Sequence, residues 1–324
     1  MDEPRIVAVV GATATGKTDL GEALADALGG EVVCADSRQV FRELEIGTGK
    51  PSSAERSARP HHLFDALALG QRPSAGWYAG AAGAVCRAVR SRGRTPVLVG
   101  GSGLWLRAAQ HGLSCEPPHD PAVRERLQAE CERLGVEALH ERLALVDPAT
   151  AARVKPRDRQ RITRALEVHE ASGRPLSWWH ERRGEPAVAG EWRVFELVVA
   201  TGVLAGRIGR RTDWMLRSGL IEEARGLLEA GHGGAVRALR AVGYDEALDV
   251  VEGGLDRDEA AARINLRTRR LAKRQRTWFR HQIEATRLDG TERATADLAR
   301  DVLEALRHRA PAPHTEPRGT AQPG

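Results

Sequence analysis

The chain has 324 residues, of which 41% are hydrophobic and 29% charged, with a formal net charge of +5 and a pI of about 9.4. This length and apolar content predict a substantial core, arranged as one α/β body with a smaller second domain. No apolar run approaches the roughly 18 to 20 residues that span a bilayer, and the N-terminus does not resemble a secretory signal, so we expect no membrane partner. The basic balance is compatible with a polyanionic partner.

The cysteines indicate a reducing compartment. Cys34, Cys86, Cys115 and Cys131 are far apart in the sequence and form no C-x-x-C pair of the kind that binds zinc or carries out redox chemistry. We therefore expect free thiols in a cytoplasmic protein.

A phosphate-binding loop is the first functional motif. Residues 11–18 fit G-x-x-x-x-G-K-[ST] and lie between a strand-like run, Ile6–Val10, and an amphipathic helix over about Thr18–Leu28. Glycines in the loop allow a tight turn, so that amide groups and the positive end of the helix face one anion. The lysine would reach the terminal phosphates and the threonine hydroxyl would hold Mg²⁺. The alternative is a structural turn. The expected cradle consists of Gly11, Ala12, Thr13, Ala14, Thr15, Gly16, Lys17 and Thr18.

Strand and helix patterns alternate after this loop. A second strand ends in an acidic residue, Asp36, and a third is followed by Gly100–Gly103 and a short helix. This alternation predicts a parallel, nucleotide-kinase-like sheet of the P-loop α/β class. We expect strands at 31–36 and 95–99, functional loops at 46–76 in which His61 and His62 are structural, and a helix at 75–92.

Helical patterns alone follow from about Leu113 to Gly190, with starts at Asp120, Asp147 and Asp158. A strand pattern at 192–200 returns to the sheet, and a long helix at 257–282 and a last strand at 285–288 follow. We therefore expect a P-loop core (1–112), a helical insertion (113–190), a region that completes the core and carries a basic helix (191–309), and a disordered tail (310–324).

Asp36 is the leading candidate for chemistry. The third strand ends without an acid, so Asp36 is the only carboxylate expected at the sheet edge beside the loop, as general base or indirect metal ligand. Its alternative is a helix N-cap. Ser102 could cap the next helix while a ligand approaches the glycine backbone, or the turn is purely structural.

A basic helix points to nucleic acid. Residues 263–280 contain no acidic side chain, and Arg263, Arg267, Arg270 and Arg274 fall on one face. A solvated helix is the alternative. Trp278 and Phe279 could be core or stacking residues. A mixed face in the insertion carries Arg157, Arg159, Arg161 and Arg164. Arg207 and Arg211, four apart, could clamp a phosphate or form ion pairs.

Together these stretches resemble the tRNA dimethylallyltransferases, also called tRNA isopentenyltransferases. The matching segments run in order from Ile6 to about Leu288; small departures are Phe41 where tyrosine is common, Ser102 for threonine, and Arg159 where proline or arginine alternates. The segments are GATATGKT (11–18), DSRQVF (36–41), IGTGKP (46–51), PHHLFD (60–65), LVGGSGLW (98–105), DPAVR (120–124), DPATAARVKPRDRQRITRALEV (147–168), AVGYDE (241–246) and LAKRQRTWFR (271–280).

The resemblance implies transfer of a dimethylallyl group from dimethylallyl diphosphate to N6 of the adenosine immediately 3′ of the anticodon in tRNA. Residues 11–18, Mg²⁺ on Thr18 and Arg211 would then neutralise the leaving diphosphate, while Asp36 accepts the amine proton. We expect a monomer that grips the anticodon stem-loop. The implied tRNA contacts are Asp36, Ser37, Arg38, Gln39, Ser102, Arg124, Gln160, Arg161, Ile162, Thr163, Arg164, Arg240, Tyr244, Lys273, Arg274, Arg276 and Arg280.

Three other functions fit parts of the sequence. An enzyme that prenylates free adenine nucleotides would not need the basic helix or the insertion. A small-molecule kinase would use the loop for ATP. An RNA-binding protein with the loop as a nucleotide switch would bind RNA without turnover.

Overall fold

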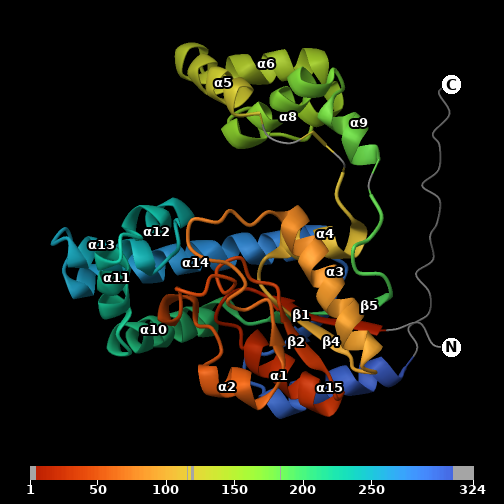
Figure 1. The fold of residues 1–324 in the computed structure, drawn as a ribbon, viewed down its shortest axis with the longest axis vertical. Coiled ribbons are helices and arrows are strands. Elements are labelled where there is room, and N and C mark those ends of the chain that lie inside the picture. Colours follow the sequence, from red (N-terminus) through yellow and green to blue (C-terminus); the bar gives the residue numbers. More distant parts are fainter. Residues whose placement is uncertain (1–4, 115, 118–119, 183, 309–324) are drawn as a thin grey trace. The chain divides into compact units, whose positions relative to one another are not determined.

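The computed structural model describes residues 5–114, 116–117, 120–182 and 184–308. Contacts divide the chain into two compact units, drawn in Figure 1. Unit 1 comprises Met1–Pro73, Ala84–Gly103 and Gly190–Gly324, and unit 2 comprises Ser74–Gly83 and Leu104–Ala189. Unit 2 is therefore larger than the insertion expected at 113–190. The expected disordered tail lies outside the described residues, as does Cys115.

Unit 1 is built on a parallel sheet of six strands in the order β3-β2-β4-β1-β5-β6. β1 is central and pairs with β4 on one side and β5 on the other, with Val7 opposite both Val97 and Arg193. This arrangement confirms the predicted P-loop α/β class. The strands are β1 (Arg5–Gly11), β2 (Glu31–Cys34), β3 (His61–His62), β4 (Pro96–Gly100), β5 (Glu191–Val198) and β6 (Thr286–Asp289).

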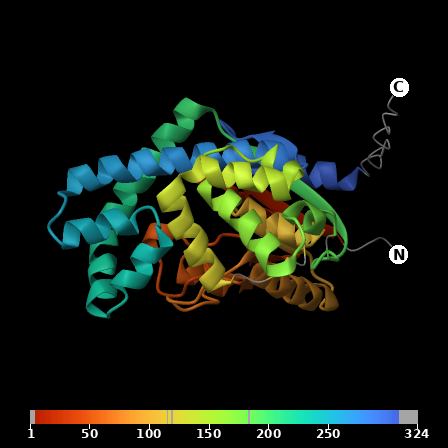
Figure 2. The same ribbon diagram turned by 90° about the horizontal axis from the view of Figure 1, so that it is seen from above.

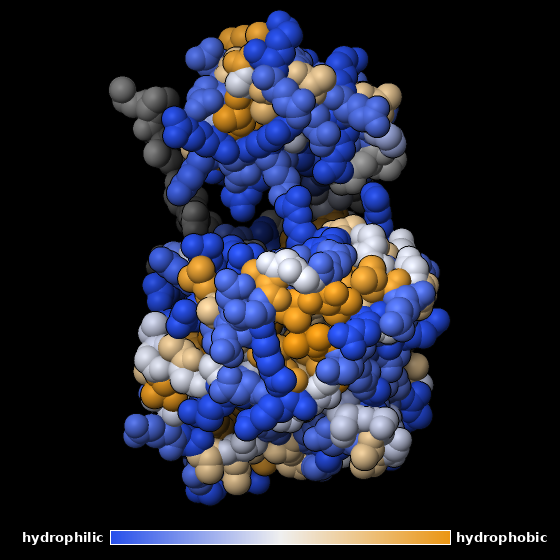
Figure 3. Space-filling model, turned by 90° about the vertical axis from the view of Figure 1, so that its left-hand side faces the viewer, coloured by the Kyte–Doolittle hydropathy of each residue, from blue (hydrophilic) through white to orange (hydrophobic). Residues whose placement is uncertain are grey.

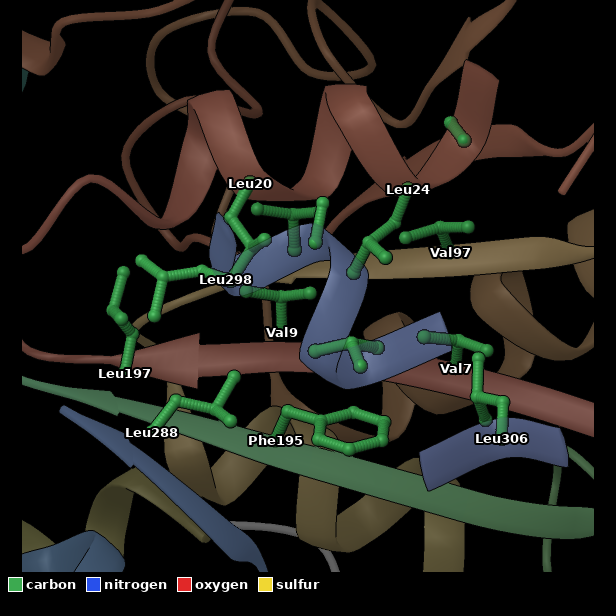
Figure 4. Packing of buried hydrophobic residues seen from close by; sticks show 14 of the residues in the cluster. Val7, Val9, Leu20, Leu24, Val97, Phe195, Leu197, Leu288, Leu298 and Leu306 are labelled. Carbon is green, nitrogen blue, oxygen red and sulfur yellow. The ribbon is translucent and has the colours of Figure 1, made fainter. Parts of the chain in front are cut away.

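The core of unit 1 lies between this sheet and helices α1 (Lys17–Ala27) and α15 (Thr295–Arg307). Figure 4 shows Val7 and Val9 of β1 facing Leu20 and Leu24 of α1, with Leu298 of α15 beside them. The intervening residues of β1 are buried as well. A strand covered on both faces needs a continuous apolar run, which is what residues 6–10 provide.

The segment at 46–76 contains more structure than the loops that the sequence predicts. A 3-10 turn, η1 (Ile46–Thr48), is followed by helix α2 (Ser53–Ala58), in which Ser52 and Glu55 form a reciprocal capping box. His61 and His62 form the edge strand β3 and not a loop, since they pair with Val32 and Val33. Two residues are too few to produce a recognisable strand pattern.

The other helices of unit 1 carry the remaining site residues. The expected long helix is confirmed as α14, whose first turn is capped by Asp256 and which Figure 2 shows in blue as an extended rod. Beside it runs α10, tied to it by the hydrogen bond that Thr212 makes with Asn265 at 2.8 Å. These helices are α3 (Ala75–Ser91, shared with unit 2), α10 (Thr201–Arg217), α11 (Leu220–Glu229), α12 (Gly233–Leu239), α13 (Tyr244–Val251) and α14 (Arg257–Gln282).

Unit 2 is helical, with Leu127, Leu143 and Ile162 in its own apolar core. Side chains of Asp120, Asp147 and Asp158 cap helix starts, as predicted. The helices are α4 (Gly103–His111, beginning at the last residue of the unit 1 segment), α5 (Pro121–Leu134), α6 (Val136–Val146), α7 (Pro148–Ala151), α8 (Arg159–Ser172) and α9 (Leu176–Glu181).

Figure 3 shows hydrophilic side chains over most of one face of unit 1, around an area where apolar side chains gather. In the described part of the chain, we find no helix with both the length and the apolar character to cross a membrane.

Candidate active site

The phosphate loop connects β1 to α1 at the carboxyl edge of the sheet. Gly16 has φ 94° and Ala14 has φ 63°, a conformation that is uncommon for a residue with a Cβ. Alternation of right- and left-handed residues turns successive amide groups toward one point and creates a concavity for an anion. The first turn of α1 adds amide groups that have no partner within the helix. The backbone of this loop can therefore direct amide groups at one anion.

Lys17 lies at the start of α1 with its ammonium near the loop, donating to the Ala12 carbonyl at 3.3 Å. Burial lowers the pKa of Lys17 to about 8, Asp36 opposes this shift, and Arg211 adds to it. The charges of Asp36 and Arg211 thus both act on the ammonium of Lys17. A desolvated cation beside an amide cradle is suited to a polyanionic ligand.

Asp36 lies two residues beyond β2, in the loop that continues toward residue 40. Its Oδ1 accepts a hydrogen bond from the Arg38 N–H at 2.9 Å, which is an Asx turn and not the helix cap considered above. Among the described residues, none is recorded as donating to Oδ2. One carboxylate oxygen thus fixes the side chain and the other remains available as an acceptor.

Arg211 reaches the site from α10. Its guanidinium donates to the Thr48 carbonyl at 2.9 Å, and burial lowers its pKa while Asp36 raises it. Gln39 donates to the carbonyls of Thr48 and Gly49 at 3.2 and 3.1 Å, so it holds the same turn. The side-chain amide donors of Gln39, an implied RNA contact, are therefore directed to the protein itself.

Two cavities meet at the phosphate loop. The first, of about 340 Å³, is lined by Thr13, Asp36 and Ser102 and also by basic residues Arg240 and Arg274. The second, of about 480 Å³, is lined by residues 14–19 of the loop and α1, including Lys17 and Thr18. Arg211 lines both. A ligand bound in either cavity could therefore contact Arg211, which also lines the other cavity.

Several implied RNA contacts near the first cavity have structural partners instead. Arg38 donates to the Leu239 carbonyl at 2.6 Å. Tyr244 is fully buried; its hydroxyl donates to Glu223 at 2.6 Å and accepts from the Gly47 N–H at 3.2 Å. The side chain of Tyr244 therefore supports the turn at 46–48 from inside and does not present itself to RNA.

Ser37 and Ser102 join two loops. The Ser102 hydroxyl accepts from the Ser37 N–H at 2.8 Å, linking the end of β4 to the residue after Asp36. The Ser102 oxygen thus holds the neighbouring loop, whereas the capping of α4 by Ser102 stays a prediction. Arg240 is exposed at the end of α12, with φ 49°.

The basic face of α14 is only partly open to solvent. Arg263, Arg270, Lys273, Arg274 and Arg280 are exposed. Arg267 is paired with Asp245 and Glu246 at 2.7 and 2.6 Å, and Arg276 donates to Thr201 at 2.8 Å. Phe279 is a core residue, whereas Trp278 is half-buried and meets Phe279 edge to face. Arg267 thus secures α14 to α13 and leaves its neighbours to meet a partner.

The implied RNA contacts in unit 2 also include both exposed side chains and side chains that bond within the protein. Arg124, Gln160 and Arg161 are exposed, but Ile162 is fully buried in the core, so its side chain does not support direct contact with RNA. Thr163 donates to the Arg159 carbonyl at 2.8 Å, and Arg164 pairs with Glu116 at 2.9 Å. A cavity of about 580 Å³ is lined by Gln160, Arg161, Arg164 and His180, among others.

Comparisons with known proteins decide the family. The sequence model described as IPP transferase matches residues 39–282, and the one described as isopentenyl transferase matches residues 4–65. A tRNA dimethylallyltransferase of Halorhodospira halophila is 44% identical over 93% of this chain and 98% of its own length. The chain belongs to the tRNA dimethylallyltransferase family. The resemblance seen in the sequence is confirmed, and the protein is a transferase.

Solved structures of the tRNA dimethylallyltransferase family share this fold. A tRNA isopentenylpyrophosphate transferase from Bacillus halodurans aligns with a TM-score of 0.68 at 34% identity, over 94% of this chain and 95% of that chain. A eukaryotic dimethylallyltransferase acting on tRNA aligns with a TM-score of 0.78 over 93% of this chain and 80% of that chain. At 22% identity, the second match shows the fold alone.

The sequence does not predict that two polar residues of this protein, Arg207 and Gln275, hold backbone segments of the site in place. Arg207 was considered only as a clamp or an ion pair, but it donates to the carbonyls of Thr15, Gly290 and Thr291 at 2.9 to 3.0 Å. Gln275 was passed over inside the basic segment. An uncharged polar residue within a run of basic residues was the one sign in the sequence that Gln275 differs from its neighbours, but it does not indicate which segment the side chain contacts.

Proposed function

We propose that the protein transfers the dimethylallyl group of dimethylallyl diphosphate to N6 of the adenosine that follows the anticodon in tRNA. The observation that carries this proposal is the pair of cavities sharing Arg211, one with Asp36 and exposed basic residues, the other with Lys17. An acceptor base and a diphosphate could thus be held on opposite sides of one reacting carbon. Family membership supports the same assignment.

The reaction follows from the charges. The N6 lone pair attacks the first carbon of the allyl group, the carbon–oxygen bond breaks, and its electrons leave with diphosphate. Amide groups of residues 11–18, Lys17 and Arg211 neutralise the charge that develops on the diphosphate. Asp36 accepts the proton that the amine loses. A stacked adenine must first flip out of its loop to reach this carboxylate.

The second cavity fits Mg²⁺, because the Thr18 hydroxyl would serve as a ligand of the ion beside the bound diphosphate. Among the described residues, no group of three or more His, Cys, Asp or Glu side chains could hold a metal ion. Mg²⁺ commonly keeps water ligands and relies on one or two protein oxygens together with substrate phosphates, so a lone hydroxyl beside a diphosphate cradle suffices. When bound, Mg²⁺ supplies further charge neutralisation to the leaving group.

RNA would lie on exposed basic side chains of both units. In unit 1 these are Arg240 and the exposed basic residues of α14, and in unit 2 they are Arg124 and Arg161, with the neutral, exposed Gln160 beside Arg161. Phosphate neutralisation releases counterions, so the affinity for tRNA should fall steeply as salt rises.

We also propose a monomer that acts in the cytoplasm. Burial raises the pKa of the Cys86 thiol to about 12, as expected for an inert, reduced cysteine. Light scattering after size-exclusion chromatography tests the monomer, which a dimer mass would contradict. Imaging of a fluorescent fusion tests the location, which a signal confined to another compartment would contradict.

The test is mass spectrometry of nucleosides from tRNA incubated with the protein, dimethylallyl diphosphate and Mg²⁺. N6-dimethylallyladenosine should appear in tRNA and should be absent when the target adenosine is replaced by guanosine. Parallel reactions offer AMP as acceptor or ATP as donor. Prenylated AMP without prenylated tRNA, or phosphoryl transfer from ATP alone, would replace the proposal by the corresponding alternative.

A further inference from the structure

One side chain of α14 contacts both loops of the candidate active site. Gln275 Oε1 accepts a hydrogen bond from the Thr13 N–H at 2.9 Å, and its Nε2 donates to the Gly101 carbonyl at 3.1 Å. Thr13 belongs to the phosphate loop and Gly101 immediately precedes Ser102. A side-chain amide carries one acceptor and two donors at its tip, so it satisfies a backbone donor and a backbone acceptor simultaneously.

The approach of Gln275 to the second loop is close. A Cβ added to Gly101 would lie 2.4 Å from Gln275 Nε2, so the glycine makes room for the amide. From there the Ser102 hydroxyl continues to the Ser37 N–H at 2.8 Å, beside Asp36. A connected path of contacts therefore leads from α14 to both the cradle and the segment that carries the carboxylate. Gln275, Thr13 and Asp36 line the same 340 Å³ cavity.

The neighbours of Gln275 face a different environment. Lys273 and Arg274 are exposed, and Gln275 and Arg276 are half-buried, so phosphate groups can approach the helix next to the amide of Gln275. A ligand that restrains these side chains also restrains the turn of helix from which Gln275 extends.

We propose that Gln275 is a positioning residue that couples RNA binding on α14 to the organisation of the diphosphate cradle and of Asp36. The proposal rests on the proposed function, because it names tRNA and diphosphate as the two ligands. Bound RNA restrains α14, and the amide of Gln275 then restrains Thr13 and Gly101. Diphosphate therefore binds loops that are already ordered, so its binding costs less conformational entropy. Linkage requires the converse, so diphosphate strengthens RNA binding by the same factor.

The coupling is measured without turnover by titrating inorganic diphosphate and Mg²⁺ into the full-length protein, with and without saturating tRNA anticodon stem-loop. The stem-loop should tighten diphosphate binding about fivefold or more in the unaltered protein. Gln275→Met keeps the volume of the side chain and removes both hydrogen bonds. The ratio of the diphosphate affinity with the stem-loop to that without it should therefore fall to about 1. The affinity of this variant for the stem-loop alone should stay within about twofold.

Thr277→Ala is the matched control on the same helix. Thr277 is exposed, and its hydroxyl donates to the Lys273 carbonyl of its own helix. Its ratio should equal that of the unaltered protein. Gln275→Glu is the second variant: it keeps an acceptor for Thr13 but sets a carboxylate against the Gly101 carbonyl, so its ratio should also fall. Should Gln275→Met not fold, Gln275→Glu decides.

A ratio of 1 in the unaltered protein, or an unchanged ratio in a folded Gln275 variant, would overturn the proposal. A Gln275 variant that binds diphosphate and the stem-loop more weakly by the same factor would also overturn the proposal, since a merely structural role predicts that result. Formation of prenylated tRNA by the unaltered protein is scored separately. The proposed function can therefore stand while the coupling fails, or fail while RNA and diphosphate still prove coupled.

Discussion

Raising the pH through about 8 is expected to weaken donor binding, because Lys17 loses its proton there. Burial lowers the pKa of Lys17 to about 8 from 10.5, and an adjacent diphosphate would raise it again. At pH 9 only about a tenth of the free protein carries the charged lysine, so affinity should be about tenfold lower, or about 1.4 kcal/mol. Binding at that pH should take up a proton.

Isothermal titration with dimethylallyl diphosphate between about pH 7 and about pH 9.5, in buffers of different ionisation enthalpy, measures both effects. Lys17→Met retains the stem without the charge; its binding should be weak throughout and nearly independent of pH in this range. An equally steep loss in Lys17→Met would refute the reasoning, since another group would then be titrating.

The free energy of unfolding of the free protein should rise, and not fall, as the pH increases above about 8. Because the folded pKa of Lys17 lies below its ordinary value, the folded state binds fewer protons between about 8 and 10.5 than the unfolded state does. This group therefore disfavours folding below about pH 8 and ceases to do so as the pH rises. Lys17→Met should raise the unfolding midpoint at neutral pH while it abolishes tight donor binding, a combination that a simple packing defect would not produce.

Three further substitutions test the assigned roles. Asp36→Asn should bind tRNA normally but slow the single-turnover rate at least about a hundredfold; an unchanged rate would remove Asp36 as the base. Arg207→Ala should weaken donor binding and lower stability by about 1–3 kcal/mol in urea unfolding, because the Thr15 carbonyl loses its charged donor; donor affinity equal to that of the unaltered protein would contradict this. Tyr244→Phe should lower stability by about 1–2 kcal/mol, since the Gly47 N–H loses its acceptor, while tRNA affinity measured by filter binding stays constant; a selective loss of tRNA affinity would restore Tyr244 as an RNA contact.

The phosphate loop could be predicted from the sequence because its geometry is local. The spacing of Gly11, Gly16 and Lys17 fixes the turn, and the flanking patterns fix the strand and the helix. The parallel sheet followed from alternation in the same way. The order of its strands did not, because β5 pairs with β1 only after the whole of unit 2, and no short-range pattern encodes that neighbour.

Side-chain direction limited the prediction of the RNA contacts. Ile162 and Arg161 are adjacent in a basic segment, yet one is in the core and the other in solvent. Arg267 and Arg270 share a helical face, but acidic groups on α13 pair with Arg267 alone. Such partners come from distant segments, so charge and spacing within one helix could not separate anchoring residues from binding residues.

The central place of β1 has a consequence for how the protein is made. β1 and the phosphate loop are synthesised long before the strand that covers the other edge of β1, which begins at Glu191, and the side chains of Arg207 and Gln275 follow later. Pairing across such sequence separations is slow, and an unpaired strand edge invites association with other nascent chains. Translation must therefore pass Gln275 before the nascent polypeptide has all the contacts that hold its phosphate loop, and products truncated before this residue should depend on chaperones.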